Sequence, residues 1–351
     1  MKATSAGQLR ALTADTVPDT EEIRPGIWAV PLRIPHGRIR YILTYLILDT
    51  RDDVHIIDAG WDSVLNLATL SDALNDIGRA VTDISSVTVT HMHPDHIGMA
   101  SRLRDYSGAE IRIGRNEQQA MILMAEGVEP TLTPAHLEMW GVPGHRQEEL
   151  TGPISITNEF YSLQADVLLG DAEALNIPGR HLTVVDTPGH TTGHICLADS
   201  SSGILFSGDH VLPTTHSGLG LGGLRSKNPV SDYLASLERL AAFDAYEVCP
   251  GHGFRFVGLA QRRQDLAQHH LRRLNETSVA LAKNPTATVW EVAEQLSWGS
   301  GWHQLKGYHL QSAIAQTAMH LDHIRSSDGS YRRGNPAPLH AIFDPTAAAA
   351  R

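Results

Sequence analysis

A six-residue segment, His91 to His96, concentrates side chains that are suited to bind metal ions. It holds three histidines and one aspartate, and it directly follows a predicted strand over residues 86–90. On a tight turn at the end of a strand, alternate residues can converge, so His91 and His93 can face one cation while Asp95 and His96 face another. Imidazole and carboxylate suit Zn²⁺, Fe or Mn²⁺. The segment therefore predicts a metal site with two groups of ligands.

Three further segments place a metal-binding residue type after a predicted strand, with a glycine beside it. Glycine lacks a Cβ and lets the backbone approach closely, which suits a crowded site. Each segment alone is consistent with an ordinary turn, but four such segments in order along the chain favour one shared site. The three segments are Gly189-His190 after the predicted strand 181–186, Gly208-Asp209 after 203–207, and Gly251-His252 after 246–249.

The first third of the chain alternates between predicted strands and helices. Runs of β-branched and aromatic residues predict strands, and apolar residues three or four positions apart predict helices. Leu67, Leu70 and Leu74, for example, fall on one helical face. The expected strands cover residues 27–34, 41–48, 54–58, 86–90 and 109–113, and the expected helices cover 62–77 and 97–106.

The rest of the chain departs from this alternation. Residues 115–165 are predicted to form a mostly helical insertion, interrupted by prolines. An insertion between two metal motifs can form a lid or a wall for the substrate, or it can simply extend the packing, and both interpretations stay open. Beyond it, helices are expected over 231–243 (capped by Ser231 or Asp232), 258–283, 288–296 and 311–324.

These patterns divide the chain into three parts. Residues 1–22 are polar and unpatterned, so we expect a flexible N-terminal arm. Residues 23–257 form the expected catalytic domain, which contains the insertion over 115–165. Residues 258–351 form an expected small helical C-terminal module, winged-helix-like in one interpretation.

The charge composition indicates which kinds of molecule the protein binds. The 351-residue chain has 28 basic and 39 acidic residues and a formal net charge of −11, which argues against a general nucleic-acid binder and favours a small-molecule substrate. A local basic groove for nucleic acid is not excluded. The sequence shows neither a secretory signal nor an apolar run long enough for a membrane span, so we expect a cytoplasmic protein without membrane contact. A homo-oligomer stays open.

In its motifs, the chain resembles the metallo-β-lactamase superfamily. The resemblance covers residues 25–255 and rests on His-x-His-x-Asp-His, a later Gly-His, a Gly-Asp and a final Gly-His. It implies an α/β fold, a four-layer αβ/βα sandwich with the metals at one edge of two packed sheets. It also implies that Asp58 supports the ligands from behind. The implied ligands are His91, His93 and His190 for the first metal, Asp95, His96 and His252 for the second, and Asp209 as the bridge.

Two positions indicate which branch of the family the chain resembles. Asp209 stands where several true β-lactamases have a cysteine or no bridging carboxylate, so antibiotic hydrolysis is not favoured. His93 stands where flavin-dependent di-iron relatives carry glutamate. The remaining pattern is similar to hydroxyacylglutathione hydrolases, thioesterases, lactonases and β-lactamase-like endoribonucleases. Residues 208–213 especially resemble the endoribonucleases, which also have a small helical C-terminal domain.

The resemblance implies a dinuclear metal-dependent hydrolase. Two divalent cations, Zn²⁺ in the first place with Fe or Mn as alternatives, lower the pKa of a shared water. The resulting hydroxide is expected to attack an ester, thioester or lactone carbonyl, with Asp95 as the catalytic residue that accepts the water's proton. Two alternatives remain: a metal-dependent phosphodiesterase or ribonuclease, and an iron-dependent sulfur dioxygenase.

Two more histidines are candidates for supporting roles. His194 lies four residues after His190 and is expected either to donate a hydrogen bond behind the ligands or to be a buried structural residue. His210 follows Asp209 directly and is a candidate for reaching the substrate.

Overall fold

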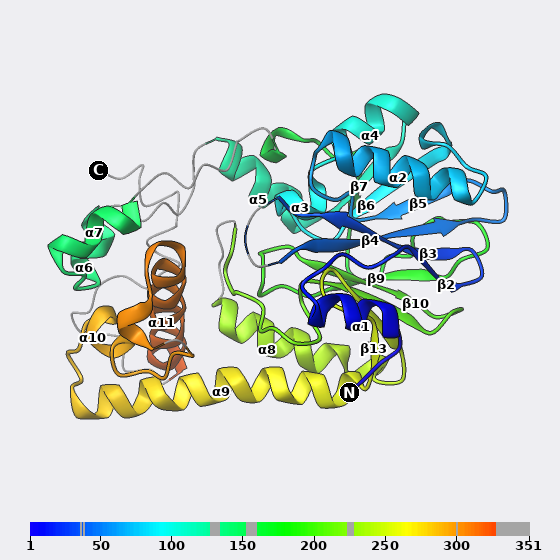
Figure 1. Ribbon diagram of the computed structural model, residues 1–351. Coiled ribbons are helices and arrows are strands. Elements are labelled where there is room, and N and C mark those ends of the chain that lie inside the picture. The colour runs from blue at the N-terminus through cyan, green and yellow to red at the C-terminus, as the bar shows by residue number, and fades with distance from the viewer. Residues whose placement is uncertain are drawn as a thin grey trace.

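Two β-sheets packed face to face form the centre of the molecule, with helices on both outer faces (Figure 1). The computed structural model describes residues 1–35, 37, 39–126, 134–151, 160–222, 228–299 and 301–327. The four-layer α/β sandwich that the sequence predicts is therefore confirmed.

The first sheet has seven strands in the order β2-β3-β4-β5-β6-β7-β8. Strands β2 to β5 pair antiparallel, and β5 to β8 pair parallel. The parallel part is the one that ends in the His91–His96 segment. The strands are β2 (Glu21–Arg24), β3 (Ile27–Arg33), β4 (Tyr41–Leu48), β5 (Val54–Ile57), β6 (Ile84–Val89), β7 (Glu110–Gly114) and β8 (Val167–Leu169).

The second sheet has six strands in the order β1-β13-β12-β11-β10-β9. Its pairs are antiparallel except β11 with β12, which run parallel and therefore end at the same edge. The strands are β1 (Lys2–Ala3), β9 (Leu182–Asp186), β10 (Ile195–Asp199), β11 (Ile204–Gly208), β12 (Glu247–Pro250) and β13 (Phe256–Val257).

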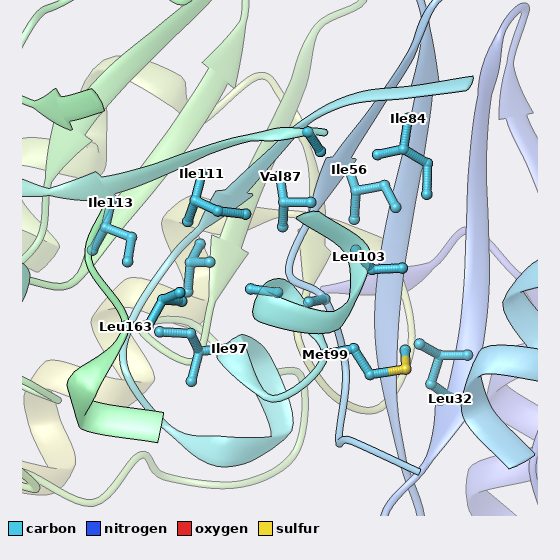
Figure 2. Close-up of a cluster of buried hydrophobic side chains, with 14 of the residues drawn as sticks. Leu32, Ile56, Ile84, Val87, Ile97, Met99, Leu103, Ile111, Ile113 and Leu163 are labelled. Atoms are coloured by element: carbon cyan, nitrogen blue, oxygen red, sulfur yellow. The ribbon is translucent and has the colours of Figure 1, made fainter. Parts of the chain in front are cut away.

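Alternation of side chains along the strands builds two cores. Ile56, Val87 and Ile111 on neighbouring strands point to the helical layer, where they meet Ile97, Met99 and Leu103 (Figure 2). Their neighbours on the opposite face form the core between the sheets, in which the rings of Tyr45 and Phe206 lie 5.0 Å apart. Helices α2 (Val64–Asp76), α3 (Pro94–Ile97), α4 (Ala100–Ser107) and α5 (Arg115–Ala125) follow strands of the first sheet.

Helices α8 (Pro229–Arg239) and α9 (Leu259–Lys283) cover the second sheet (Figure 1). The cap of α8 differs from the expected Ser231 or Asp232. Asn228 caps it instead, because its side chain accepts hydrogen bonds from the N–H groups of Val230 and Ser231, and Pro229 occupies the first turn. Proline suits that position because its fixed φ fits a helix and its missing N–H would be unpaired there anyway.

The sequence predicts residues 1–22 as a flexible arm, but they take part in the fold: β1 joins the second sheet, and residues 21 and 22 begin β2 of the first sheet. Lys2–Ala3 pairs with β13, and helix α1 (Ala6–Thr13) follows, its first turn capped by Ser5. The Thr4 hydroxyl donates to Glu247 at 2.5 Å, and Ser5 donates to Glu21 at 2.6 Å. These polar contacts are made across long sequence distances, so local patterning does not reveal them.

The insertion and the C-terminal residues share one small core. Helices α6 (Pro134–Met139) and α7 (Gly144–Thr151) from the insertion pack against α10 (Val289–Ala293) and α11 (Gly307–Ser327). Leu137 and Trp140 are buried with Trp290 and Ile314, and the Trp290 N–H donates to the Trp140 carbonyl at 2.9 Å. The helical insertion and helical C-terminal module are confirmed, although packing places α6 and α7 with that module.

Helix α9 connects this module to the sandwich. It begins beneath the second sheet and extends beyond it to α10 and α11 (Figure 1). Within the described ranges, no helix combines the length and the apolar character that crossing a membrane requires. After Val257 the described chain contains helices only, which favours the helical over the winged-helix-like interpretation.

Candidate metal centre

The segments that carry the predicted ligands lie at one edge of the sandwich. Strand β6 leads into His91, β9 leads into the loop that carries His190, β11 leads into Asp209, and β12 leads into His252. The side chains of all seven predicted ligands meet there, in groups whose ligand atoms lie within 4.8 Å of one another. Two of these groups share no residue, His91 with His93 and His190, and Asp95 with His96 and His252; a third, His91 with His96 and Asp209, overlaps both. The structure therefore brings together every residue of the predicted set.

The first group consists of three imidazoles. Nε2 of His91 lies 2.9 Å from Nδ1 of His93, and Nε2 of His190 lies 3.1 Å from that same Nδ1. The other nitrogen of His93 and of His190 bonds a backbone carbonyl, so in the neutral rings the two atoms 3.1 Å apart both present lone pairs, which favours a cation between them.

The second group consists of two imidazoles and a carboxylate. Oδ2 of Asp95 lies 3.2 Å from Nε2 of His252 and 3.8 Å from Nε2 of His96. His96 and His252 are buried, whereas 19% of the Asp95 side chain is exposed. Asp95 is thus the member of this group that solvent and a substrate can reach.

Asp209 lies between the two groups. Its Oδ1 is 3.3 Å from Nε2 of His252 and 3.4 Å from Nε2 of His96, and its Oδ2 is 3.8 Å from Nε2 of His190. One carboxylate oxygen therefore faces each group, which is the arrangement that a bridging ligand requires.

Hydrogen bonds behind the cluster fix the orientation of four imidazoles. A neutral histidine whose far nitrogen donates to a backbone carbonyl or a carboxylate presents the lone pair of its other nitrogen to the site. His93 Nε2 donates to Leu221 O at 2.8 Å, and His190 Nδ1 donates to Gly218 O at 2.7 Å. His252 Nδ1 donates to Tyr41 O at 2.9 Å. For His96 the acceptor is a carboxylate, Oδ2 of Asp58, at 2.7 Å.

Hydrogen bonds from Thr90 hold the carboxylate of Asp58 in turn. Its Oδ1 accepts from the Thr90 N–H at 2.7 Å and its Oδ2 from the Thr90 hydroxyl at 2.9 Å, so the residue before His91 is tied to it as well. Asp58 adopts φ +59°, which few residues other than glycine do. The position behind the ligands is the one that the sequence analysis expects for Asp58.

Glycine is required at residue 251. A Cβ built there would lie 2.7 Å from Oδ1 of Asp209 and 2.7 Å from Cε1 of His96. The backbone before His252 thus passes directly against the carboxylate of Asp209, and any larger residue would displace one of its neighbours.

The two supporting histidines lie behind the cluster. His194 is fully buried; its Nε2 accepts from the Asp209 N–H at 3.2 Å, and its Nδ1 bonds the Thr187 hydroxyl at 2.8 Å. His194 is thus a buried, hydrogen-bonded residue, which is one of the two alternatives that the sequence analysis leaves open. His210 is also fully buried, with its ring 4.6 Å from that of Tyr233. His210 is therefore not accessible to a substrate in this structure, contrary to the expectation that it reaches one.

Glu117 is a supporting residue that the sequence analysis misses. It lies in the first turn of α5, is fully buried, and accepts from the N–H of Met92 at 2.8 Å and from the N–H of Gly193 at 2.7 Å. It therefore ties the segment of His91 and His93 to the loop of His190. An acidic residue in the first turn of a helix is common for electrostatic reasons, so the sequence gives no signal of this role.

The charges of the two groups differ in the metal-free protein. Burial and then the neighbouring imidazole of His93 lower the pKa of His190 to about 4. Burial would also lower the pKa of His252, but Asp209 and Asp95 outweigh it and raise that pKa to about 10. Conversely, burial would raise the pKa of Asp209, but His252 and His96 hold it well below its usual value. The histidines of the second group are therefore protonated in the metal-free protein, and a binding cation would release those protons.

The residues fit divalent cations. Nε2 of His96 and Nε2 of His252 lie 3.4 and 3.3 Å from Oδ1 of Asp209, and all three atoms are buried without a contact that has the geometry of a hydrogen bond. Buried polar atoms are rarely left unpaired, and a set of nitrogen and oxygen donors that converge in this way matches what Zn²⁺ and similar ions bind.

Comparison with known proteins is consistent with this geometry. The family model of the metallo-beta-lactamase superfamily matches residues 37–252. The chain is 26% identical over 324 residues to the probable metallo-hydrolase YqjP of Bacillus subtilis, covering 87% of this chain and 95% of that protein. It is 29% identical over 231 residues to the acyl-coenzyme A thioesterase MBLAC2 of Gallus gallus, covering 62% of this chain and 74% of that protein.

A solved structure shares the fold over nearly the whole chain. The beta-lactamase domain protein from Burkholderia ambifaria superposes with a TM-score of 0.75 at 24% identity, covering 93% of this chain and 95% of that one. The structural similarity extends beyond residues 37–252, because these residues are a smaller share of the chain than the 93% that the comparison covers.

Proposed function

Because this chain belongs to the metallo-β-lactamase superfamily and is a metal-dependent hydrolase, we propose that it hydrolyses thioesters of small organic acids at a pair of divalent cations. Esters and lactones have the same reacting carbonyl and form the wider class. The observation that carries the proposal is the position of Asp209, whose two oxygens face two separate groups of ligands.

We assign the seven candidate ligands to two cations. His91, His93 and His190 would hold one cation, and Asp95, His96 and His252 would hold the other, with Asp209 shared. Three imidazoles in one group and a mixed nitrogen and oxygen set in the other suit Zn²⁺, with Fe or Mn²⁺ as alternatives. When bound, two such cations polarise a carbonyl oxygen and acidify a water molecule.

A side chain of the protein would then accept the proton of the attacking water. Asp95 is the partly exposed carboxylate of the site, and although burial works to raise its pKa, the imidazoles of His96 and His252 keep that pKa below its ordinary value. It is therefore ionised at neutral pH and can accept a proton from the attacking water. Asp58 would hold the ring of His96 in place during that transfer.

The thioester class is supported by the relatives. The MBLAC2 protein is an acyl-coenzyme A thioesterase, and the chain matches 74% of its length. The net charge of −11 is also unfavourable for RNA, the main alternative substrate.

A paired experiment tests this proposal. The metal content of the purified protein would be measured, and turnover of a thioester, a lactone, a phosphodiester and RNA would be compared. A His93→Ala variant should lose both metal and turnover. His181→Ala is the matched control, because His181 is an exposed histidine at the start of β9, at the opposite end of that strand from His190. Full turnover in His93→Ala, or hydrolysis of RNA alone, would overturn the proposal.

A further inference from the structure

A short loop, residues 217–222, supplies hydrogen-bond acceptors to the first group of predicted ligands. The carbonyl of Leu221 accepts from Nε2 of His93 at 2.8 Å, and the carbonyl of Gly218 accepts from Nδ1 of His190 at 2.7 Å. Each of these bonds fixes which nitrogen of the ring faces the site. Two of the three imidazoles in this group are thus oriented by one loop that contains no predicted ligand.

The acceptors behind the second group come from other parts of the chain. Nδ1 of His96 donates to the carboxylate of Asp58 at 2.7 Å, and Nδ1 of His252 donates to the carbonyl of Tyr41 at 2.9 Å. Neither acceptor belongs to the 217–222 loop. A shift of the loop would therefore change the orientation of imidazoles in the first group and leave those of the second group in place.

Hydrogen bonds attach one side of the loop to the segments that carry His190 and Asp209. They run from the N–H of Gly220 to Gly189 O at 2.9 Å, from the N–H of Leu221 to His190 O at 2.8 Å, and from the hydroxyl of Ser217 to Asp209 O. The loop and these segments therefore form one hydrogen-bonded unit, and its position depends on what packs against its other side.

Met319 of α11 packs against that other side. A Cβ built at Gly220 would lie 2.5 Å from Cε and 3.1 Å from Sδ of Met319, so the end of the thioether rests directly on the Gly220 backbone. Gly220 adopts φ +65°, a conformation that favours glycine. The half-buried Met319 also packs against the core cluster to which Leu219 belongs. A side chain from the C-terminal module thus touches the loop that orients two predicted ligands.

Polar contacts with the start of α8 hold α11 in this position. The side-chain amide of Asn228 donates to Met319 O at 2.8 Å and to Oδ2 of Asp322 at 3.1 Å. The hydroxyl of Ser231 bonds Nδ1 of His323 at 2.7 Å. Because the same Asn228 caps α8, the backbone at Met319 is fixed to the helical layer of the second sheet. Its side chain can therefore hold the loop at a defined distance from that layer.

We propose that Met319 is a positioning residue for the first group of ligands. It keeps the 217–222 loop seated, so that the carbonyls of the loop hold the rings of His93 and His190 in the orientation that a cation requires. Helix α11 thereby helps to build a site to which it contributes no predicted ligand. The inference rests on the proposed function for the role of the two histidines as ligands, but the contact between Met319 and the loop does not depend on it.

Shortening the Met319 side chain should weaken the binding of one cation and spare the other. Met319→Ala removes the atoms that rest on Gly220, so the loop gains freedom and its carbonyls orient the first group less well. We expect the affinity for the cation of that group to fall about tenfold, while the affinity of the second group stays unchanged. Titration of the chelator-treated protein with Zn²⁺, in competition with a chromophoric chelator, measures both binding steps.

A His252→Ala background identifies which step is weakened. This substitution removes a ligand of the second group, so the affinity that remains belongs to the first group, and adding Met319→Ala should lower it by the same factor. Met319→Leu keeps the volume of the side chain and should retain an affinity within about twofold of the wild type, because exchange of Met for Leu is well tolerated in packed regions.

The matched control is Met139→Ala, which removes the same kind of half-buried side chain from α6, where it packs on the shared core of the module. It should leave both affinities near the wild-type values, and thermal unfolding shows whether each variant is folded. An equal loss of affinity in Met139→Ala and Met319→Ala would overturn the inference, because the effect would then come from general destabilisation of the module.

Hydrogen exchange tests the contact without any metal. In the chelator-treated protein the N–H groups of Gly220 and Leu221 are bonded within the site, and Met319→Ala should raise their exchange rates about tenfold, whereas Met139→Ala should not. If the wild type binds Zn²⁺ and Met319→Ala binds it with the same affinity, the inference is wrong, whatever the exchange rates are. If the wild type binds no cation but the loop still exchanges faster in Met319→Ala, the proposed function alone is overturned.

Discussion

The carboxylate of Glu117 and the backbone N–H of Gly193 are 2.7 Å apart, although 76 positions separate them in the sequence. The second oxygen of Glu117 accepts from Met92 at 2.8 Å. The packing around this contact is tight, since a Cβ at Gly193 would lie 2.0 Å from the Glu117 nitrogen. One side chain outside the ligand set therefore fixes the spacing of the loops that carry His91, His93 and His190.

Replacing Glu117 by glutamine should weaken metal binding without removing any ligand. The amide can accept at one oxygen, but its NH₂ group would face the N–H of Met92 or Gly193, so one backbone donor loses its partner. We expect the free energy of unfolding to fall by about 1–3 kcal/mol and metal affinity to fall about 10- to 100-fold. Competition with a chromophoric chelator measures the affinity.

The control for this change is Glu126→Gln, at the exposed C-terminal end of the same helix. It should leave metal affinity and stability near the wild-type values. An equal loss of stability in both variants, or unchanged metal affinity in Glu117→Gln, would contradict a positioning role for Glu117.

Stability of the metal-free protein should pass through a maximum near the ordinary pKa of histidine. The pKa of His190 is lowered to about 4, so between pH 6.5 and 4 the unfolded chain binds a proton there that the folded chain does not. Stability therefore falls as the pH drops through this window. The pKa of His252 is raised to about 10, so its contribution is complete below pH 6.5 and is lost as the pH rises toward 10.

Denaturant unfolding of the chelator-treated protein at pH 5, 6.5 and 9 measures this dependence. His252→Gln should flatten the alkaline side and leave the acidic side in place, because the acidic side depends on buried histidines such as His190 and His210. Stability that rises steadily from pH 6.5 to 9 would show that His252 is not paired with Asp95 and Asp209.

Sequence patterns predict the sandwich and the proximity of the ligand candidates for the same reason. His91, His190, Asp209 and His252 each come at the end of a strand or in the loop just after it, and strand ends that share an edge bring such residues together. The predicted β4 over 41–48 coincides with the observed strand because its branched and aromatic residues are buried on both faces. That these residues bind metal stays a prediction of the sequence and the geometry.

Other features depend on contacts that the sequence does not encode locally. His210 follows Asp209 in the chain, but the turn after β11 buries it against Tyr233. The contacts of Glu117 join a side chain to distant backbone groups, which leave no pattern. Likewise, helices α6 and α7 contain ordinary apolar residues, and only the path of the chain decides that they pack on α10 and α11.

The shared core of these helices should be a stabilising unit that is separate from the metal centre. Ile314 is fully buried in it, so Ile314→Ala removes apolar contacts and leaves a cavity, at a cost of about 2–5 kcal/mol. Metal content should stay unchanged, because no predicted ligand lies in this core. The control Val279→Ala, on the 48%-exposed Val279 of α9, should change stability by less than about 0.5 kcal/mol. Loss of metal in Ile314→Ala would show instead that the two units unfold together.

Replacing Gly251 by alanine tests the contact between the β12 loop and the carboxylate of Asp209. The new Cβ would lie 2.7 Å from Oδ1 of Asp209 and 2.7 Å from Cε1 of His96, so one of these two side chains has to move. A displacement of a few tenths of an ångström lengthens bonds to a cation, and we expect a loss of at least about tenfold in metal affinity, with turnover falling in parallel. Gly144→Ala is the matched control, because a Cβ there meets no atom within 4 Å. If Gly251→Ala binds metal as tightly as Gly144→Ala does, Asp209 and His96 are not held in the positions that the structure shows.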